Sequence, residues 1–374
     1  MALRLSEMTL DEVDRLQHVA LMRLTLRVMG ETHRLLGDYA AWLGDWVRGQ
    51  AGHDGDVGAG LSAGLAEADR RYRAMMASWR ELFEAARWQA VTLPLGAWLV
   101  KHNHFMAEVQ QPVQEELSAG DLGLLLRLWQ ERRQRALLVA NQRTYGDSLQ
   151  LSDRVWRLEN GGLSQIRGTL ATAMTERTNA YDLARKLEGV LGADQDLPRW
   201  TRGRLYGMTA AQRAVGEGGL LRGSENRSRG VAYNALRLAR TELQYASHAI
   251  TTEVAKHSPW VLGRYVRLSP AHPEIDICDE YASGGPYPVS DEILPLHPNC
   301  LCYYEEELAS GDEFSRQVRG WLAGDNAYLD DYATWLGVRQ PAELVLWGLS
   351  EADSLELWLG QSSDAHAALL RLGR

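Results

Sequence analysis

The sequence predicts a mainly α protein with a small α+β module, and three observations lead to this fold class. Apolar residues recur at helical spacing through the first half of the chain, where almost nothing has strand character. Two short runs rich in Val, Leu and Tyr flank a Pro-, Gly- and Asp-rich stretch, and helical patterns return after it. We therefore expect four regions: a helical N-terminal region at 1–146, a helical connector at 147–220, the α+β module at 221–310, and an acidic helical C-terminal region at 311–374.

The N-terminal region is expected to be a helical bundle. One helix is predicted over residues 9–48, with Gly30 or Gly37 as a possible break within it. A second helix is expected to end at Leu93-Pro94, because proline lacks the N–H that a helix interior needs, and another is expected to follow it. The many Trp, Met and Leu residues of this region indicate a packed core rather than a cofactor site.

The rest of the chain is expected to alternate between helices and two strands. Residues 147–192 predict two helices, and residues 231–256 predict one helix with a stripe of small and apolar residues. The run from Trp260 to Ser269 predicts a strand, and Cys300 to Glu305 predicts a second. Between them, residues 270–299 lack helical periodicity, and a loop this long requires something to hold it.

The C-terminal region is acidic and is expected to be helical. From residue 305 to the end it contains thirteen Asp and Glu residues against five Arg. A stripe of Phe314, Val318, Trp321 and Leu322 indicates one amphipathic helix.

Charge and composition exclude several classes. A formal net charge of −9 gives no electrostatic case for nucleic-acid binding by the whole surface. The stretch 199–240 is nonetheless rich in arginine, and Arg222, Arg227 and Arg229 are candidate contacts to DNA phosphates or to an acidic partner. A solvated surface is the alternative interpretation. The N-terminus lacks the apolar core of a signal peptide, and no apolar run approaches the roughly 20 residues that span a bilayer, so we expect a soluble protein made in a cytoplasm.

All three cysteines of the chain lie in one segment, together with two histidines: Cys278, Cys300, Cys302, His272 and His297. Three interpretations remain open at this point. Zn²⁺ is held by Cys278, His297, Cys300 and one of Cys302 or His272; or Cys278 forms a disulfide with Cys300 or Cys302; or the thiols are buried and reduced. Cys300 and Cys302 would share one face of a strand, which favours joint ligation.

No catalytic constellation stands out. A thiol beside histidine could form a nucleophilic pair, and His-x-Asn at 297–299 is similar to a fragment of a nuclease motif, but no further pattern supports either chemistry. His102 and His104 are predicted to be surface residues, because a spacing of two does not place them on one helix face. We do not expect the protein to be an enzyme.

Several of these residues resemble the phage Mu F-like head morphogenesis family of minor head proteins. The resemblance rests on Ala239-Arg240-Thr241-Glu242, Trp260, Cys278-Asp279 and His297-Pro298-Asn299-Cys300-Leu301-Cys302, and it covers about residues 147–305. Leu301 departs from the family pattern, which has Arg there. The resemblance implies structural roles for Arg240 and Glu242.

The resemblance also implies a function. It predicts a structural minor head protein of a tailed phage, which acts in procapsid assembly near the portal vertex and is located in the virion after assembly in the host cytoplasm. The implied partners are the portal protein and capsid or scaffolding proteins, with DNA as a further partner and no membrane. The alternative is a metal-dependent nuclease or toxin-like effector delivered with phage DNA.

Overall fold

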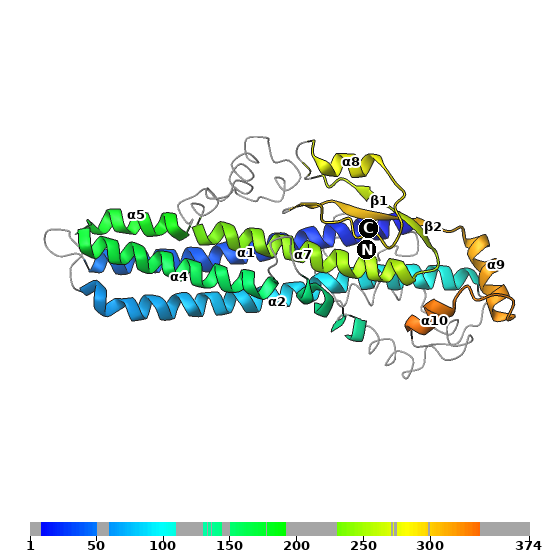
Figure 1. Cartoon of the computed structure of the whole chain (residues 1–374), viewed down its shortest axis with the longest axis horizontal. Coiled ribbons are helices and arrows are strands. Elements are labelled where there is room, and N and C mark those ends of the chain that lie inside the picture. Colours follow the sequence, from blue (N-terminus) through cyan, green and yellow to red (C-terminus); the bar gives the residue numbers. More distant parts are fainter. Residues whose placement is uncertain are drawn as a thin grey trace, which may run out of the picture. The chain divides into compact units, whose positions relative to one another are not determined.

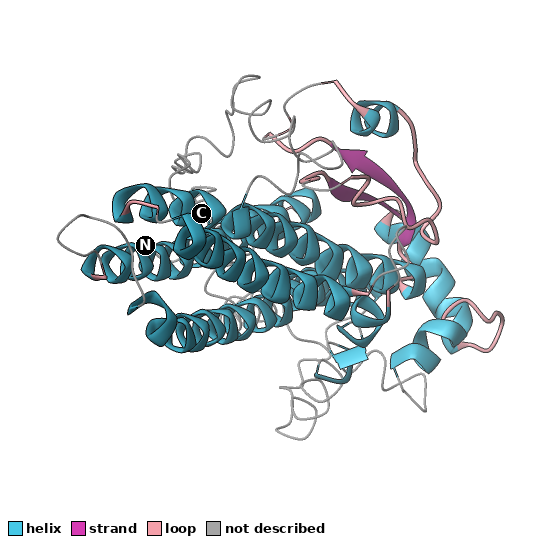
Figure 2. Cartoon of the chain, turned by 60° about the vertical axis from the view of Figure 1, so that its left-hand side comes forward, coloured by secondary structure: helices cyan, strands magenta, loops and turns pink. Residues whose placement is uncertain are grey.

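The fold is mainly helical with one two-stranded antiparallel sheet, which confirms the predicted class (Figure 2). No helix in the described part of the chain combines the length and apolar character needed to cross a membrane. The computed structural model describes residues 9–50, 60–109, 130–143 without 133 and 136, 150–191 without 177, 230–270, 272, 275–297 and 300–336.

The first helix, α1 (Leu10–Gly49), starts at a capping box made by Thr9 and Glu12 and does not break at either glycine. The Thr9 N–H donates to Glu12 Oε2 at 2.9 Å, and the Glu12 N–H donates to Thr9 Oγ1 at 3.3 Å. The predicted break at Gly30 or Gly37 is therefore wrong. A helical glycine costs only about 1 kcal/mol relative to alanine, and burial of the apolar stripe on this helix outweighs that cost.

The second helix, α2 (Gly60–Val109), continues through Pro94, so the predicted end at Leu93-Pro94 is also wrong. An interior proline costs about 3 kcal/mol because it removes a hydrogen bond and crowds the preceding turn. The side chains on both sides of it, such as Val91 and Leu95, are buried and offset that cost. The Thr92 hydroxyl donates to the Trp88 carbonyl at 2.9 Å within the same stretch.

The helices after residue 150 follow the predicted pattern. α4 (Leu151–Glu176) and α5 (Ala180–Leu191) are the two helices expected over 147–192. α7 (Gly230–His257) is the single helix expected over 231–256. The predicted stripe of α7 is buried, and it consists of Ala235, Ala239, Leu243, Ala246, Ile250 and Val254.

The sheet pairs β1 (Val261–Arg267) with β2 (Tyr303–Leu308), and in this register Val266 lies opposite Tyr304. The first strand agrees with the prediction, whereas the second begins three residues later than expected. The connecting segment contains a short helix that the sequence did not predict, α8 (Ile277–Ser283), which lies near β1 (Figure 1). Its start depends on a capping box made by Asp276 and Asp279, not on apolar periodicity.

Two helices represent the described part of the acidic C-terminal region, α9 (Gly311–Leu322) and α10 (Asp330–Leu336). Ser310 caps α9, and Phe314, Val318 and Trp321 of the predicted stripe are buried. Leu322 is 42% exposed, so its assignment to the stripe was wrong. Residues 337–374 lie outside the described residues.

The chain divides into two compact units, and both are built from segments that are distant in sequence. The first contains residues 1–24, 87–140 and 242–374, and the second contains residues 25–86 and 141–241. All cysteines, both strands and α8 belong to the first unit.

Trp260 lies at the centre of an aromatic core in the first unit. Its ring is fully buried, and the centre of the ring lies 5.4 Å from that of Phe105, 6.0 Å from that of Phe314 and 5.3 Å from that of Tyr332. His102 is part of this core and has no exposed surface, so the predicted surface position was wrong for it. Its Nδ1 lies 2.5 Å from the hydroxyl of Tyr332, which explains how a polar ring is accommodated there.

Candidate metal centre

The backbone around α8 places the first cysteine in the interior. The Asp276 side chain accepts a hydrogen bond from the Cys278 N–H at 2.6 Å, and the Asp279 side chain accepts one from the Asp276 N–H at 2.8 Å. This capping fixes the first turn of α8, so that Cys278 has no exposed surface while the preceding Ile277 is 47% exposed.

The other two cysteines lie just before β2. The Cys300 N–H donates to the His297 carbonyl at 3.1 Å and closes a turn. Cys300 and Cys302 are both buried, but they precede β2, so the predicted shared face of a strand does not form. They pack with Val266 of β1 and Tyr304 of β2 in one small core.

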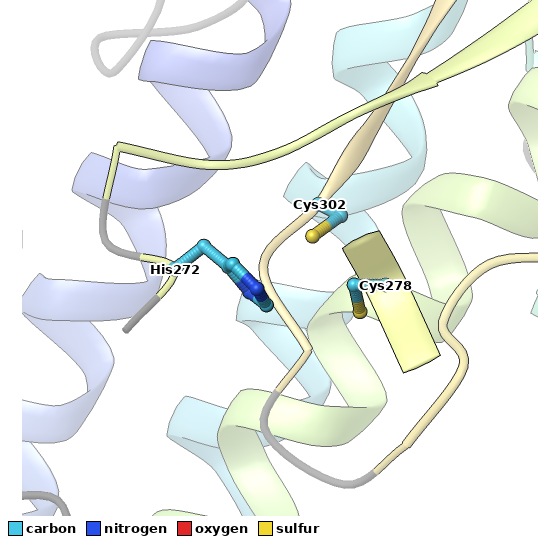
Figure 3. Close-up of side chains that lie close together, drawn as sticks. All are labelled: His272, Cys278 and Cys302. Atoms are coloured by element: carbon cyan, nitrogen blue, oxygen red, sulfur yellow. The ribbon is translucent and has the colours of Figure 1, made fainter. Parts of the chain in front are cut away.

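The structure brings together all five side chains that the sequence singled out as ligands. Two overlapping groups form, one of His272, Cys278 and Cys302 and one of Cys278, His297 and Cys300, with ligand atoms within 4.8 Å of one another inside each group. Figure 3 shows the first group, contributed by the segment after β1, by α8 and by the segment before β2. This Cys/His cluster could hold a metal ion.

The distances inside the cluster suit tetrahedral ligation. Cys278 Sγ lies 3.8 Å from Cys300 Sγ and 3.2 Å from His297 Nε2. Two sulfurs bound tetrahedrally to one Zn²⁺, each about 2.3 Å from the metal, lie roughly 3.8 Å apart. The three cysteines are free in the structure, since a disulfide needs a sulfur–sulfur distance of about 2.05 Å.

The thiols also influence one another's protonation. Hydrogen bonds from Cys278 and Cys302 lower the pKa of Cys300, and the hydrogen bond to Cys300 raises the pKa of Cys278. Cys300 is therefore the sulfur that most readily becomes a thiolate, and the thiolate is the form of cysteine that binds metals.

Two carboxylates surround the histidines of the cluster. Asp279 Oδ2 lies 2.8 Å from His272 Nε2, and Asp276 Oδ2 lies 3.2 Å from His297 Nε2. The Asp276 N–H and then His272 lower the pKa of Asp279. At metal centres a carboxylate typically orients a histidine ligand through the ring nitrogen that the metal does not use, whereas both contacts here are at Nε2.

The remaining predicted residues do not join the cluster. Glu242 is buried on α7 with 3% exposure, and Arg240 is half-buried on the same helix. Arg222, Arg227 and Arg229 lie outside the described residues, as do Pro298 and Asn299 of the family motif.

Comparison of the chain with models of known families, with curated proteins and with solved structures finds no match. The cluster is therefore interpreted from its own geometry.

Sequence reasoning missed Arg264 and Tyr304, which organise the segment between α8 and β2. Arg264 has no exposed surface, and its guanidinium carbon lies 4.1 Å from the centre of the Tyr304 ring. The Tyr304 hydroxyl accepts hydrogen bonds from the N–H groups of Ile293 and Leu294 at 3.0 and 2.7 Å. No linear motif indicates these contacts, because strand pairing alone places Tyr304 beside Arg264.

Proposed function

We propose that the chain is a structural minor head protein of a tailed phage, and that a Zn²⁺ ion stabilises its module between β1 and β2. The observation that carries the metal part of this proposal is the convergence of three cysteines and two histidines, from three separate segments, on one small core. The long segment between the strands is short of regular structure, and ligands at both ends of it would fix its path.

The donor set suits zinc. Thiolates and imidazoles are ligands that Zn²⁺ prefers, and hard cations such as Mg²⁺ take oxygen ligands instead. We assign Cys278, Cys300, Cys302 and His297 as the four ligands. His297 Nε2 lies 3.2 Å from both Cys278 Sγ and Asp276 Oδ2, whereas the nearest printed partner of His272 Nε2 is a carboxylate oxygen, Asp279 Oδ2 at 2.8 Å.

Closed coordination supports a structural role. Catalytic zinc keeps one position open for water or substrate, whereas structural zinc has four protein ligands. The assignment adds Cys302 of the first group to the three residues of the second, which gives four protein ligands, and the three cysteines are at most 2% exposed. A buried, fully ligated ion would hold the module together without reacting.

The role in a phage head rests on the motif resemblance. Several of its described residues are structural elements of the first compact unit: Trp260 is the centre of the aromatic core, and Cys278, Cys300 and Cys302 form the small core beside the sheet. A rigid module of this kind suits a protein that contacts the portal protein and capsid or scaffolding proteins during assembly. DNA contact would involve the arginine-rich stretch that contains Arg222, Arg227 and Arg229.

Elemental analysis of the purified protein tests the metal. We expect about one equivalent of zinc per chain and thiols that resist alkylation until a chelator is added. Less than half an equivalent of zinc, together with freely alkylated thiols, would rule the metal out.

A matched pair of variants tests the ligand assignment. His297→Ala removes a proposed ligand, so zinc content should fall to a small fraction of that of the parent protein. His272→Ala removes only an outer contact and should retain most of the zinc. Equal zinc content in the two variants would contradict the assignment.

Mass spectrometry of purified virions tests the biological role. The protein should be present in particles at low copy number and should co-purify with portal protein from assembly intermediates. Absence from particles, or a nuclease activity that is lost in His297→Ala, would favour the effector alternative.

A further inference from the structure

One face of α7 is both buried and polar. Gln244, Ser247 and His248 follow a spacing of three and four residues, so they lie on one side of the helix. Their exposures are 1%, 0% and 4%. The side-chain nitrogen and oxygen of Gln244, the hydroxyl of Ser247 and both ring nitrogens of His248 make no hydrogen bond that meets ordinary limits.

Such a concentration of unpaired polar atoms is unusual. More than about 90% of buried polar groups in proteins have a hydrogen-bond partner, and an unpaired one costs roughly 1–3 kcal/mol. Exceptions point to a water, an ion or a ligand that completes the arrangement. Of the three residues, His248 packs on the core that contains the cysteines of the Cys/His cluster.

His248 reaches the core that contains the cysteines. Its ring packs edge-to-face on Tyr304, with 5.4 Å between ring centres, and Tyr304 packs against Cys300 and Cys302 in that core. Burial, together with the charge of Arg264, lowers the pKa of His248 to about 4, and the nearby Cys300 sulfur and a hydrogen-bonding contact with the Cys302 backbone oppose this shift. A neutral imidazole at this place has one ring N–H to donate.

We propose that His248 is a positioning residue of the metal centre, whose ring N–H donates a hydrogen bond to the metal-bound thiolate of Cys300. This inference rests on the proposed zinc site. Three thiolates and one neutral imidazole around Zn²⁺ leave the centre with a formal charge of about −1, which is costly to bury without donors. Hydrogen bonds to a charged acceptor are about twice as strong as those to a neutral one, so loading the metal gives the ring N–H of His248 a stronger acceptor than the neutral Cys302 backbone.

Metal binding by four variants, each compared with the wild-type protein, tests this role. His248→Phe keeps a ring against Tyr304 and removes the donor, whereas His248→Asn and His248→Gln place an amide N–H near one or the other ring nitrogen position. His102→Phe is the matched control, because His102 is an equally buried histidine of the same unit that packs among aromatic rings.

Loss of an outer hydrogen bond of this kind typically weakens metal binding about 10- to 100-fold. We expect His248→Phe to bind Zn²⁺ more weakly by this factor and to shift the sulfur-to-metal charge-transfer bands of the Co²⁺-loaded protein. Asn or Gln should restore the affinity and the bands in part. His102→Phe should leave both unchanged even if it lowers the stability of the fold.

A second measurement does not depend on any variant folding. In the wild-type protein loaded with ¹¹³Cd²⁺, a hydrogen bond to a metal-bound sulfur transmits a scalar coupling between the metal and the donating proton. We expect such a coupling to the ring N–H of His248. Its absence, or a His248→Phe variant with wild-type affinity and spectrum, would overturn the inference while the zinc site stands. A wild-type protein that binds no metal would instead overturn the proposed function.

Discussion

The guanidinium carbon of Arg264 lies over the ring of Tyr304, 4.1 Å from its centre, and both side chains are buried beside the Cys/His cluster. Arg264 Nη1 donates to Thr252 Oγ1 at 2.8 Å, and Nη2 donates to the Asp291 carbonyl at 2.6 Å. The pair thus joins β1 and β2 to α7 and to the segment that precedes the last two cysteines. These contacts fix residues 291–294 of that segment.

Tyr304→Phe should destabilise this region by about 1–3 kcal/mol. The hydroxyl accepts hydrogen bonds from two backbone N–H groups, those of Ile293 and Leu294, and phenylalanine leaves both without that acceptor. Tyr303→Phe is the control, since the adjacent ring stacks on His18 at 4.3 Å and keeps that contact as phenylalanine. Denaturant unfolding measures both, and equal stabilities for the two variants would show that the hydroxyl of Tyr304 is not important.

A buried ion cluster gives a second prediction. Lys101 Nζ lies 2.6 Å from Asp14 Oδ1 and 2.6 Å from Glu306 Oε2, and all three side chains are less than 10% exposed. Lys101→Met leaves two buried carboxylates without their cation, which typically costs about 3–5 kcal/mol. The free energy of unfolding from denaturant titration measures this loss.

Lys256→Met provides the matched control. Lys256 pairs with Glu292 at 3.2 Å, but Glu292 is 77% exposed, and exposed pairs contribute at most about 1 kcal/mol. The two lysine variants should therefore differ clearly in stability. If Lys101→Met were as stable as Lys256→Met, the buried cluster would not stabilise the fold.

Much of the fold could be predicted from the sequence, because apolar residues recur at helical spacing along its long helices. The stripe on α7 and the two helices of 147–192 are examples. The errors have two local causes. Burial of the neighbouring side chains lets α2 continue through Pro94, and α8 depends on the capping pair Asp276 and Asp279 rather than on an apolar stripe.

The candidate site could be predicted only in part, for a similar reason. The count and clustering of the cysteines indicated a shared site, and the structure brings all five predicted ligands together. The groups around them come from elsewhere: His248 lies on α7 and Arg264 on β1. Their proximity depends on tertiary packing, which no spacing along the chain expresses.

The buried His102 predicts how stability depends on pH. Burial lowers the pKa of His102 to about 3, so the folded state binds no proton there between about pH 3 and 6.5, whereas the unfolded chain does. Acid therefore favours unfolding, and the contribution of this residue falls by about 2–3 kcal/mol between pH 7 and pH 4.5.

His102→Asn tests this contribution. Asparagine does not titrate and has an amide near the position of Nδ1, where the hydroxyl of Tyr332 lies. The variant should be less stable at neutral pH because the ring is lost, yet its stability should fall less steeply on acidification. Unfolding free energies at several pH values measure the slope, and an unchanged slope would mean that His102 is not one of the groups responsible.

The proposed zinc site predicts which segments lose protection from amide hydrogen exchange when the metal is removed. Ligands at both ends of the segment between β1 and β2 would hold α8 and the start of β2 in place, so a chelator should speed amide hydrogen exchange in 277–283 and 303–308. α4 belongs to the other compact unit and contributes no ligand, so its exchange at 163–173 should not change. Exchange measured by mass spectrometry, before and after chelation and again after zinc is restored, separates the two regions. Uniform acceleration across both would indicate global destabilisation, and no change in either would show that the segment does not depend on a metal.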